Sequence, residues 1–507
     1  MGQVWCEVSA MKRFLSAMNR VVLWLIAASL ALDPLAAASR QDKEAAALRG
    51  QLLTHISVLA SDDFAGREPG TEGEAKTLRY IGQNWSDFGM VSGTNDPGHP
   101  WFAPVTLVGR RPDTSRAVFT RRGKRVFVPQ DQVLVITSGK RALVENAPMT
   151  FVGTGEVIPA RAELAGRIAV LLDGGREDSK RQNALLAGGA SGVLTVLDGD
   201  RSLDHVAATR QREGYALAGA ELGGDIDAFI SASALSTALN GTKFNFAMLT
   251  AAAADPKFFP LPLDLTVSLE ATSRETRIHT HNVIGKVPGK RPELGAVLLV
   301  AHWDHFGTCA QPPAEHLICN GAIDNASGLA VLIEVARRLS KGPQLDRDVY
   351  LLATTGEELG LLGAQAFAEN PPIPLAQFVA AFNIDSVALA PAGRSFGIVG
   401  NGMTRLDAQI AAVAKQQKKK LAIDEKANAY VKRQDGWALL QHDVPAVMVS
   451  SSWSDLALVE HFFDTDYHRP SDVVRPGLEL GGAADDVDFL TALARWFGDA
   501  KKVPSRP

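Results

Sequence analysis

The C-terminal half of the chain alternates between short apolar runs and longer amphipathic stretches. Strands are predicted at 297–300, 348–353 and 378–384, and helices at 326–339 and 361–368. Strands that alternate with helices in this way favour a mostly parallel sheet sandwiched by helices. The sequence therefore predicts an α/β domain after residue 280.

The preceding part of the chain shows two different patterns of apolar residues. Residues 44–59 and 72–88 carry apolar positions at helical spacing, so both segments are predicted to be helices. Between residues 110 and 276 the chain instead shows short β-rich runs separated by glycine and charged turns. We therefore predict a mostly β domain over 111–276, inserted into an α/β domain that consists of 39–110 and 277–507.

Residues 1–38 contain the three parts of a secretory signal in the expected order. Lys12, Arg13 and Arg20 precede an apolar stretch over 21–32, and small residues follow up to Ala38. The apolar stretch is shorter than the roughly 20 residues that a membrane-spanning helix prefers, which favours a cleaved signal over an uncleaved anchor. We predict cleavage after Ala38, export to the periplasm or the extracellular space, and no stable membrane span in the mature chain.

Composition narrows the functional classes. The chain has 507 residues, of which 46% are hydrophobic, so it is long and apolar enough for more than one buried core. Its 52 Lys and Arg residues against 56 Asp and Glu residues give a net charge of −4, which argues against a nucleic-acid partner. Three cysteines are too few for a disulfide-dense scaffold. None of these features indicates an oligomeric state.

Residues that can bind metal follow the predicted strands. In α/β sheets, ligands bind beyond the carboxyl ends of the strands. Taken singly, each residue has an ordinary structural explanation, such as an acidic pair at a helix N-terminus. Together they form a nitrogen and oxygen donor set that suits zinc and has enough carboxylates for two ions. They are His302, Asp324, Glu357, Glu358, Asp385 and His468.

Two neighbouring zinc ions place specific demands on the carboxylates around them. One carboxylate must bridge the ions, and another must stay free to take a proton from the water that the ions share. Glu357 and Glu358 are adjacent and point in different directions, so one can bind metal while the other acts as a base. Asp304 lies two residues after His302 and is expected to accept the second ring N–H of that histidine.

Five short motifs carry these residues. They are His302-x-Asp304, Asp324-Asn325-x-Ser327-Gly328, Gly356-Glu357-Glu358-x-Gly360, Asn383-x-Asp385 and Tyr467-His468. In order and spacing they resemble the motifs of the co-catalytic di-zinc exopeptidase family that includes bacterial leucyl aminopeptidases and glutamate carboxypeptidases. The early segment Gly66-Arg67-x-Pro69-Gly70 is similar as well, and Phe151-Val152-Gly153-x-Gly155 looks like part of the protease-associated (PA) domain inserted in many members.

The resemblance implies a zinc exopeptidase fold, a peptide substrate and a role for each site residue. One zinc would be held by His302 and Asp385, the other by Glu358 and His468, and Asp324 would bridge the two. Glu357 would be the general base that activates a zinc-bridging hydroxide, and Tyr467 would stabilise the oxyanion of the intermediate.

Cys309 and Cys319 lie in the loop between His302 and Asp324. Two cysteines that remain in an exported protein after signal removal favour a disulfide, which would stiffen the rim of the site. A pair of free thiols is the alternative, and thiolate ligation to zinc is a third. We predict the disulfide.

The motifs and the resemblance together predict an exported di-zinc metallopeptidase that removes N-terminal residues from peptides. Carboxypeptidase and dipeptidase activities share this metal core in the family. An arginine or lysine cluster that binds a C-terminal carboxylate would favour the carboxypeptidase, and Arg433 and Arg469 are the candidates. A glutaminyl cyclase-like acyltransferase with one zinc and a non-catalytic binding ectodomain are further alternatives, which the complete ligand set disfavours. The preferred side chain at the cleaved position is not predicted.

Overall fold

The computed structural model describes residues 34–174, 178–197, 199, 201–210, 212–220 and 225–504. The chain divides into two units: Met1–Ala103 with His281–Pro507, and Pro104–Thr280. The domain boundaries predicted at 110 and 276 fall inside two long strands, β2 (Phe102–Arg121) and β10 (Leu261–Val287). The predicted signal lies outside the described residues, except for the first turn of α2 (Pro34–Leu59).

The first unit contains the α/β sheet that the alternating pattern predicts. Its strand order is β16-β17-β15-β11-β14-β10. Neighbours from β17 to β14 run parallel, and β16 and β10 pair antiparallel at the two ends. The strands other than β10 are β11 (Ala296–His302), β14 (Asp348–Thr354), β15 (Phe378–Asn383), β16 (Gly397–Val399) and β17 (Ala446–Ser450).

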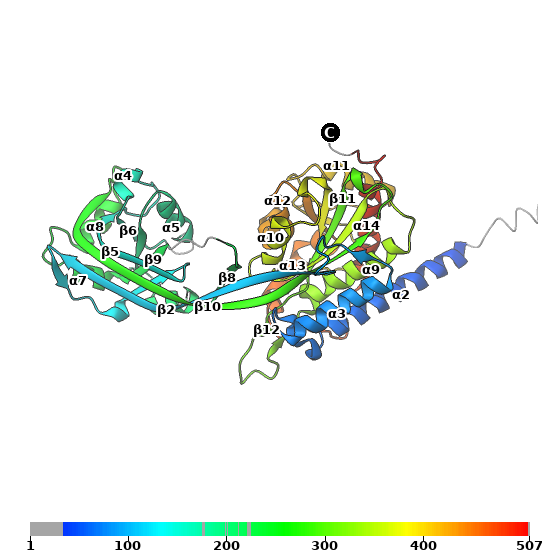
Figure 1. The fold of residues 1–507 in the computed structure, drawn as a ribbon, viewed down its shortest axis with the longest axis horizontal. Coiled ribbons are helices and arrows are strands. Elements are labelled where there is room, and N and C mark those ends of the chain that lie inside the picture. The colour runs from blue at the N-terminus through cyan, green and yellow to red at the C-terminus, as the bar shows by residue number, and fades with distance from the viewer. Residues whose placement is uncertain are drawn as a thin grey trace, which may run out of the picture. The chain divides into compact units, whose positions relative to one another are not determined.

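Helices cover both faces of this sheet because successive side chains of a buried strand point to opposite faces. Val297 and Leu299 of β11 pack into one core with α2, α3 (Glu72–Asp87), α9 (Gly328–Ser340) and α14 (Gly481–Gly498). Leu298 of the same strand packs into a second core with α10 (Leu362–Glu369) and α12 (Gly436–Leu440). Figure 1 shows these helices around β11. The predicted α/β architecture is confirmed.

The second unit has its own core, and its strands belong to the same sheet through β10. β5, β6, β7 and β9 run parallel to one another, β4 pairs antiparallel with β9, and β10 pairs antiparallel with β5. The strands are β4 (Val133–Thr137), β5 (Arg141–Phe151), β6 (Ile168–Leu172), β7 (Gly192–Leu197) and β9 (Ile226–Ser231). The helices of this unit include α5 (Asp178–Ala187), α6 (Leu203–Arg210), α7 (Ala232–Leu239) and α8 (Phe246–Ala253).

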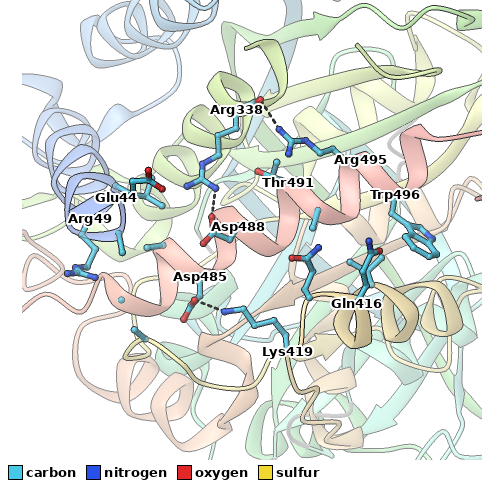
Figure 2. Close-up of a pocket in the computed structure, with 18 of the residues that line it drawn as sticks. Glu44, Arg49, Arg338, Gln416, Lys419, Asp485, Asp488, Thr491, Arg495 and Trp496 are labelled. Atoms are coloured by element: carbon cyan, nitrogen blue, oxygen red, sulfur yellow. Dashed lines mark hydrogen bonds and ion pairs between the residues drawn. The ribbon is translucent and has the colours of Figure 1, made fainter. Parts of the chain in front are cut away.

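A cavity of about 1010 Å³ opens among α2, α9, α14 and α11 (Asp407–Gln416) in the first unit. Its charged side chains pair with one another: Arg338 with Asp488, and Lys419 with Asp485 (Figure 2). No predicted metal ligand lines this cavity. The candidate site therefore lies elsewhere in the unit.

Candidate metal centre

The parallel strands bring the predicted ligands to one edge of the sheet. His302 is the last residue of β11, Glu357 and Glu358 follow the end of β14, and Asp385 follows the end of β15. Because β11 pairs in parallel with both β14 and β15, the carboxyl ends of the three strands meet at the same edge. Residues that are distant in sequence therefore become neighbours.

Asp324 lies between two histidines, in the turn Ala322–Ser327 that leads into α9. Its Oδ1 is 3.2 Å from His302 Nε2, and its Oδ2 is 3.4 Å from His468 Nε2. A second carboxylate faces each histidine: Asp385 Oδ1 is 3.7 Å from His302 Nε2, and Glu358 Oε2 is 2.9 Å from His468 Nε2. The five predicted ligands thus form two halves that share Asp324.

The donor atoms of this cluster fit a metal. Several of these contacts are ion-pair contacts without normal hydrogen-bond geometry, so His302 Nε2, Asp324 Oδ2 and His468 Nε2 are buried without a hydrogen-bond partner. Buried polar atoms are normally satisfied, and unpaired ones at a converging set indicate a missing ion. Among the described residues, ligand atoms lie within 4.8 Å of one another in two groups that share His302, one with Asp324 and Glu358 and one with Glu357 and Asp385. The donor set is imidazole and carboxylate, which suits zinc.

The electrostatics of the cluster favour a bound cation. Burial alone would lower the pKa of His302, but Glu357, Asp324 and Asp385 raise it well above its usual value. The pKa of His468 likewise rises to about 9, because Asp324 and Glu358 outweigh the effect of burial. Without metal, the histidines take up protons to balance the surrounding carboxylates. A zinc ion would supply that positive charge instead.

The two adjacent glutamates have opposite electrostatic environments. Burial raises the pKa of Glu357 well above its usual value, and the charges of Glu358 and Asp385 add to this effect. The pKa of Glu358 is lowered despite burial, because it is hydrogen-bonded to His305 and lies 2.9 Å from His468 Nε2. Glu358 is therefore held as an anion, whereas Glu357 binds a proton more tightly than an ordinary glutamate does.

Asp304 supports the site differently from the prediction. Its Oδ1 and Oδ2 accept the backbone N–H groups of Glu357 and Glu358 at 3.1 and 3.4 Å. Its carboxylate is 3.9 Å from His302 Nδ1, whereas its backbone carbonyl lies 3.2 Å from that nitrogen. The predicted hydrogen bond is therefore made by the carbonyl, because the carboxylate is occupied by the glutamate backbone. Nδ1 then carries the hydrogen and Nε2 is left for metal.

Three supporting residues were not assigned a specific role from the sequence. His305 Nδ1 lies 2.6 Å from Glu358 Oε1, so this ring fixes the carboxylate opposite His468. Asp472 accepts the backbone N–H groups of Ile323 and Asp324 at 2.9 and 3.0 Å. Arg67 donates to backbone carbonyls, including that of Trp303 at 2.8 Å. The sequence signal for Arg67 was its position inside the early motif, for His305 its place directly after His302-x-Asp304, and for Asp472 its place four residues after His468.

Tyr467 is packed beside a metal ligand. Its ring stacks on His468 with centroids 3.6 Å apart and contacts Phe463 at 4.6 Å. Burial raises the pKa of Tyr467, and the carboxylates Asp324 and Glu358 raise it further. The phenol therefore remains protonated and available as a hydrogen-bond donor at any physiological pH.

Cys309 and Cys319 form a disulfide, as predicted. The bond closes the hairpin between β12 (Gly307–Thr308) and β13 (Ile318–Cys319), which lies in the loop between His302 and Asp324. Gly66 approaches this hairpin so closely that a Cβ atom would lie 2.5 Å from the carbonyl oxygen of Cys319 and 2.8 Å from Gly307 Cα. Glycine is therefore required at position 66, where φ is also +67°.

Comparison with known proteins confirms the resemblance. Residues 282–481 match peptidase family M28, and this segment contains all five predicted ligands. The alkaline phosphatase isozyme conversion protein of Escherichia coli K12 is 35% identical over 103 residues, which are 18% of this chain and 29% of that protein. Aminopeptidase YwaD of Bacillus subtilis 168 is 29% identical over 133 residues, 26% of each chain. The chain thus spans less than a third of the length of these curated relatives.

The fold is also similar to a solved structure over most of its length. The aminopeptidase from Aneurinibacillus sp. strain AM-1 has a TM-score of 0.50 and 18% identity, with 90% of this chain and 94% of that chain covered. At this identity the likeness supports the fold alone.

Proposed function

We propose that this chain, whose residues 282–481 match peptidase family M28, is a zinc-dependent aminopeptidase that holds two zinc ions. The observation that carries the proposal is the position of Asp324, which presents one carboxylate oxygen to His302 and the other to His468. Asp385 and Glu358 complete the two halves. One shared carboxylate between two imidazole and carboxylate pairs is the donor set that a two-zinc centre needs.

Each remaining residue then has a chemical task. Bound zinc would polarise the scissile carbonyl and lower the pKa of the attacking water. Glu357 takes the proton of that water and returns it to the leaving amine, and its raised pKa makes it a stronger base than an ordinary glutamate. Tyr467 donates its phenol hydrogen to the carbonyl oxygen as negative charge develops there. Asp304 holds the backbone of Glu357 and Glu358 in place.

We further propose that the protein is exported and that Pro104–Thr280 is a PA domain. The signal-like pattern of residues 1–38 and the disulfide between Cys309 and Cys319 support export, since disulfides persist in oxidising compartments. Within the described residues, no helix is both long and apolar enough to cross a membrane. The insert motif over 151–155 and the separate core of the second unit support the domain assignment.

Zinc content and peptide hydrolysis test this function together. The purified mature chain should contain two zinc ions, release nitroaniline from aminoacyl-nitroanilides and lose this activity on chelation. Glu357→Gln should reduce kcat by about 10²–10⁴-fold while zinc content stays unchanged, because a base and not a ligand is removed. The exposed Glu293→Gln serves as the matched control and should leave kcat unchanged.

The alternatives give different results in the same experiment. Cleavage of N-blocked dipeptides but not of nitroanilides would identify a carboxypeptidase. One zinc per chain with cyclisation of N-terminal glutamine would identify an acyltransferase. Full activity in Glu357→Gln, or activity that persists without metal, would refute the proposed mechanism.

A further inference from the structure

Arg433 lies next to the tyrosine to which we assign oxyanion stabilisation. Its Nη2 donates a hydrogen bond to Tyr467 Oη at 3.3 Å. The guanidinium carbon also lies 5.0 Å from the ring centroid of Phe463, 5.6 Å from that of Tyr467 and 5.7 Å from that of Tyr430. Three aromatic rings therefore hold the guanidinium in one place through cation–π contacts. The side chain is fixed although it is exposed.

Within the described residues, Arg433 has neither an acidic partner nor a backbone carbonyl to which it donates. Among the described residues, no carboxylate forms an ion pair with it, and its one hydrogen bond is to a neutral phenol. Arg475, by contrast, pairs with Asp466 at 2.7 Å. Arg469, the other arginine considered from the sequence, donates to the backbone carbonyl of Asp464. Arg433 is thus the arginine whose planar set of donors is free to bind a carboxylate.

The covalent geometry of a peptide brings such a carboxylate within reach. From the carbonyl carbon of a scissile bond, the carboxylate carbon of a following C-terminal residue is three bonds away, or about 4 Å. An acidic side chain on that residue is one or two bonds farther. A guanidinium one hydrogen bond from the phenol that contacts the scissile carbonyl can therefore meet either group.

We propose that Arg433 binds a carboxylate carried by the residue that follows the scissile bond. The preferred substrates are then dipeptides, whose C-terminal carboxylate occupies this position, or longer peptides with aspartate or glutamate there. This inference rests on the proposed peptidase function and on the placement of Tyr467 at the scissile carbonyl. It assigns a substrate class that the metal centre itself does not determine.

Two pairs of substrates distinguish a C-terminal carboxylate from an acidic side chain as the group that Arg433 binds. Leucyl-glycine compared with leucyl-glycinamide tests the C-terminal group, and leucyl-aspartamide compared with leucyl-asparaginamide tests the side chain. We expect kcat/KM to favour the charged member of at least one pair by about tenfold or more. In Arg433→Met this ratio should fall to about 1, whatever happens to the absolute rates.

Lys432→Met is the matched control. It removes a positive charge from the adjacent residue, whose ammonium lies 5.2 Å from the Trp437 ring. This variant should retain the preference for the charged substrate, because a general charge effect is not proposed. Ratios near 1 in the unaltered protein, or a preference that survives in Arg433→Met, would overturn the inference.

Ligand binding to the variant Glu357→Gln tests the role of Arg433 independently of peptide hydrolysis. Isothermal titration of this variant with leucyl-glycine and leucyl-glycinamide measures the carboxylate preference without turnover. We expect the dipeptide to bind about tenfold more tightly, and the double variant Glu357→Gln, Arg433→Met to lose this difference. A preference in binding without hydrolysis by the unaltered chain would contradict the peptidase function alone. Equal binding within both pairs, with leucyl-aspartamide and leucyl-asparaginamide titrated in the same way, would contradict the role of Arg433.

Discussion

At the scale of single residues, the most consequential side chain outside the ligand set is Arg67. It is fully buried and donates to the backbone carbonyls of Leu59, Trp303 and Asn320 at 2.6–2.8 Å. Its Nη2 also donates to the carbonyls of Gly321 and Asp324 at 3.1 and 3.5 Å. Burial lowers the pKa of Arg67 to about 10, so the group stays charged near neutral pH. One cation therefore joins the loops that carry two ligands and lies beside their carboxylates.

Replacing Arg67 by lysine should weaken zinc binding as well as the fold. Lysine keeps the charge but cannot place donors on five carbonyls, so the free energy of unfolding should fall by about 3 kcal/mol or more. Because the loop of Asp324 loses its support, the zinc dissociation constant should rise by about 10–100-fold, measured by competition with a chelator.

Arg347→Lys provides the matched control for this prediction. Arg347 is equally buried and donates to the backbone carbonyls of Leu294, Phe497 and Val503. None of these residues belongs to the metal centre, so this variant should lose stability while its zinc affinity stays unchanged. If both variants bind zinc equally well, Arg67 is only a structural residue.

At the scale of elements, the sequence predicts those helices and strands whose pattern of apolar and polar residues is local. β11 and α9 were predicted within two residues of most of their ends, because an apolar run and an amphipathic stretch are local signals. The lengths of β2 and β10 were not predicted, since β10 continues by pairing with distant segments: Leu269 lies opposite Val144, and Val283 lies opposite Ala353. The candidate ligands were selected by their chemistry, whereas the role of Arg67 was missed because hydrogen bonds to backbone carbonyls leave no sequence pattern.

The contact between α14 and the end of β17 should make stability depend on pH. Asp486 of α14 accepts hydrogen bonds from Ser450 Oγ at 2.8 Å and from the backbone N–H of Ser451 at 2.7 Å. Burial nevertheless raises its pKa from 3.8 to about 7, and the neighbouring Asp485 adds to this effect. The folded state then binds a proton more tightly than the unfolded state. The stability that this proton contributes is present below about pH 4 and is lost as the pH rises to about 7.

Asp486→Asn should remove this dependence. Compared with the variant, the unaltered protein should lose about 2–3 kcal/mol of unfolding free energy between about pH 5 and about pH 8. Urea unfolding of both proteins at the two pH values measures this difference, and contributions from other titrating groups cancel. A constant difference between the proteins across this range would show that Asp486 titrates normally.

At the scale of the whole molecule, the two units have separate hydrophobic cores. One core cluster lies within residues 48–103 and 281–503, and another lies within residues 117–271. The proposed metal centre belongs entirely to the first unit, since its candidate ligands lie between His302 and His468. A ligand stabilises the state that binds it, by about 4 kcal/mol when its free concentration is about 1,000 times its dissociation constant.

Scanning calorimetry should therefore show two unfolding transitions, of which zinc shifts only one. Adding zinc to the chelated protein should raise that transition by several degrees, while the other stays in place. The shifted transition is assigned to the first unit by His468→Gln, which removes a ligand and should abolish most of the shift. This histidine is a suitable probe because its side chain is one-third exposed and its replacement leaves no large buried cavity. A single transition that zinc shifts would mean that the units unfold as one cooperative body, and no shift would contradict zinc binding at this centre.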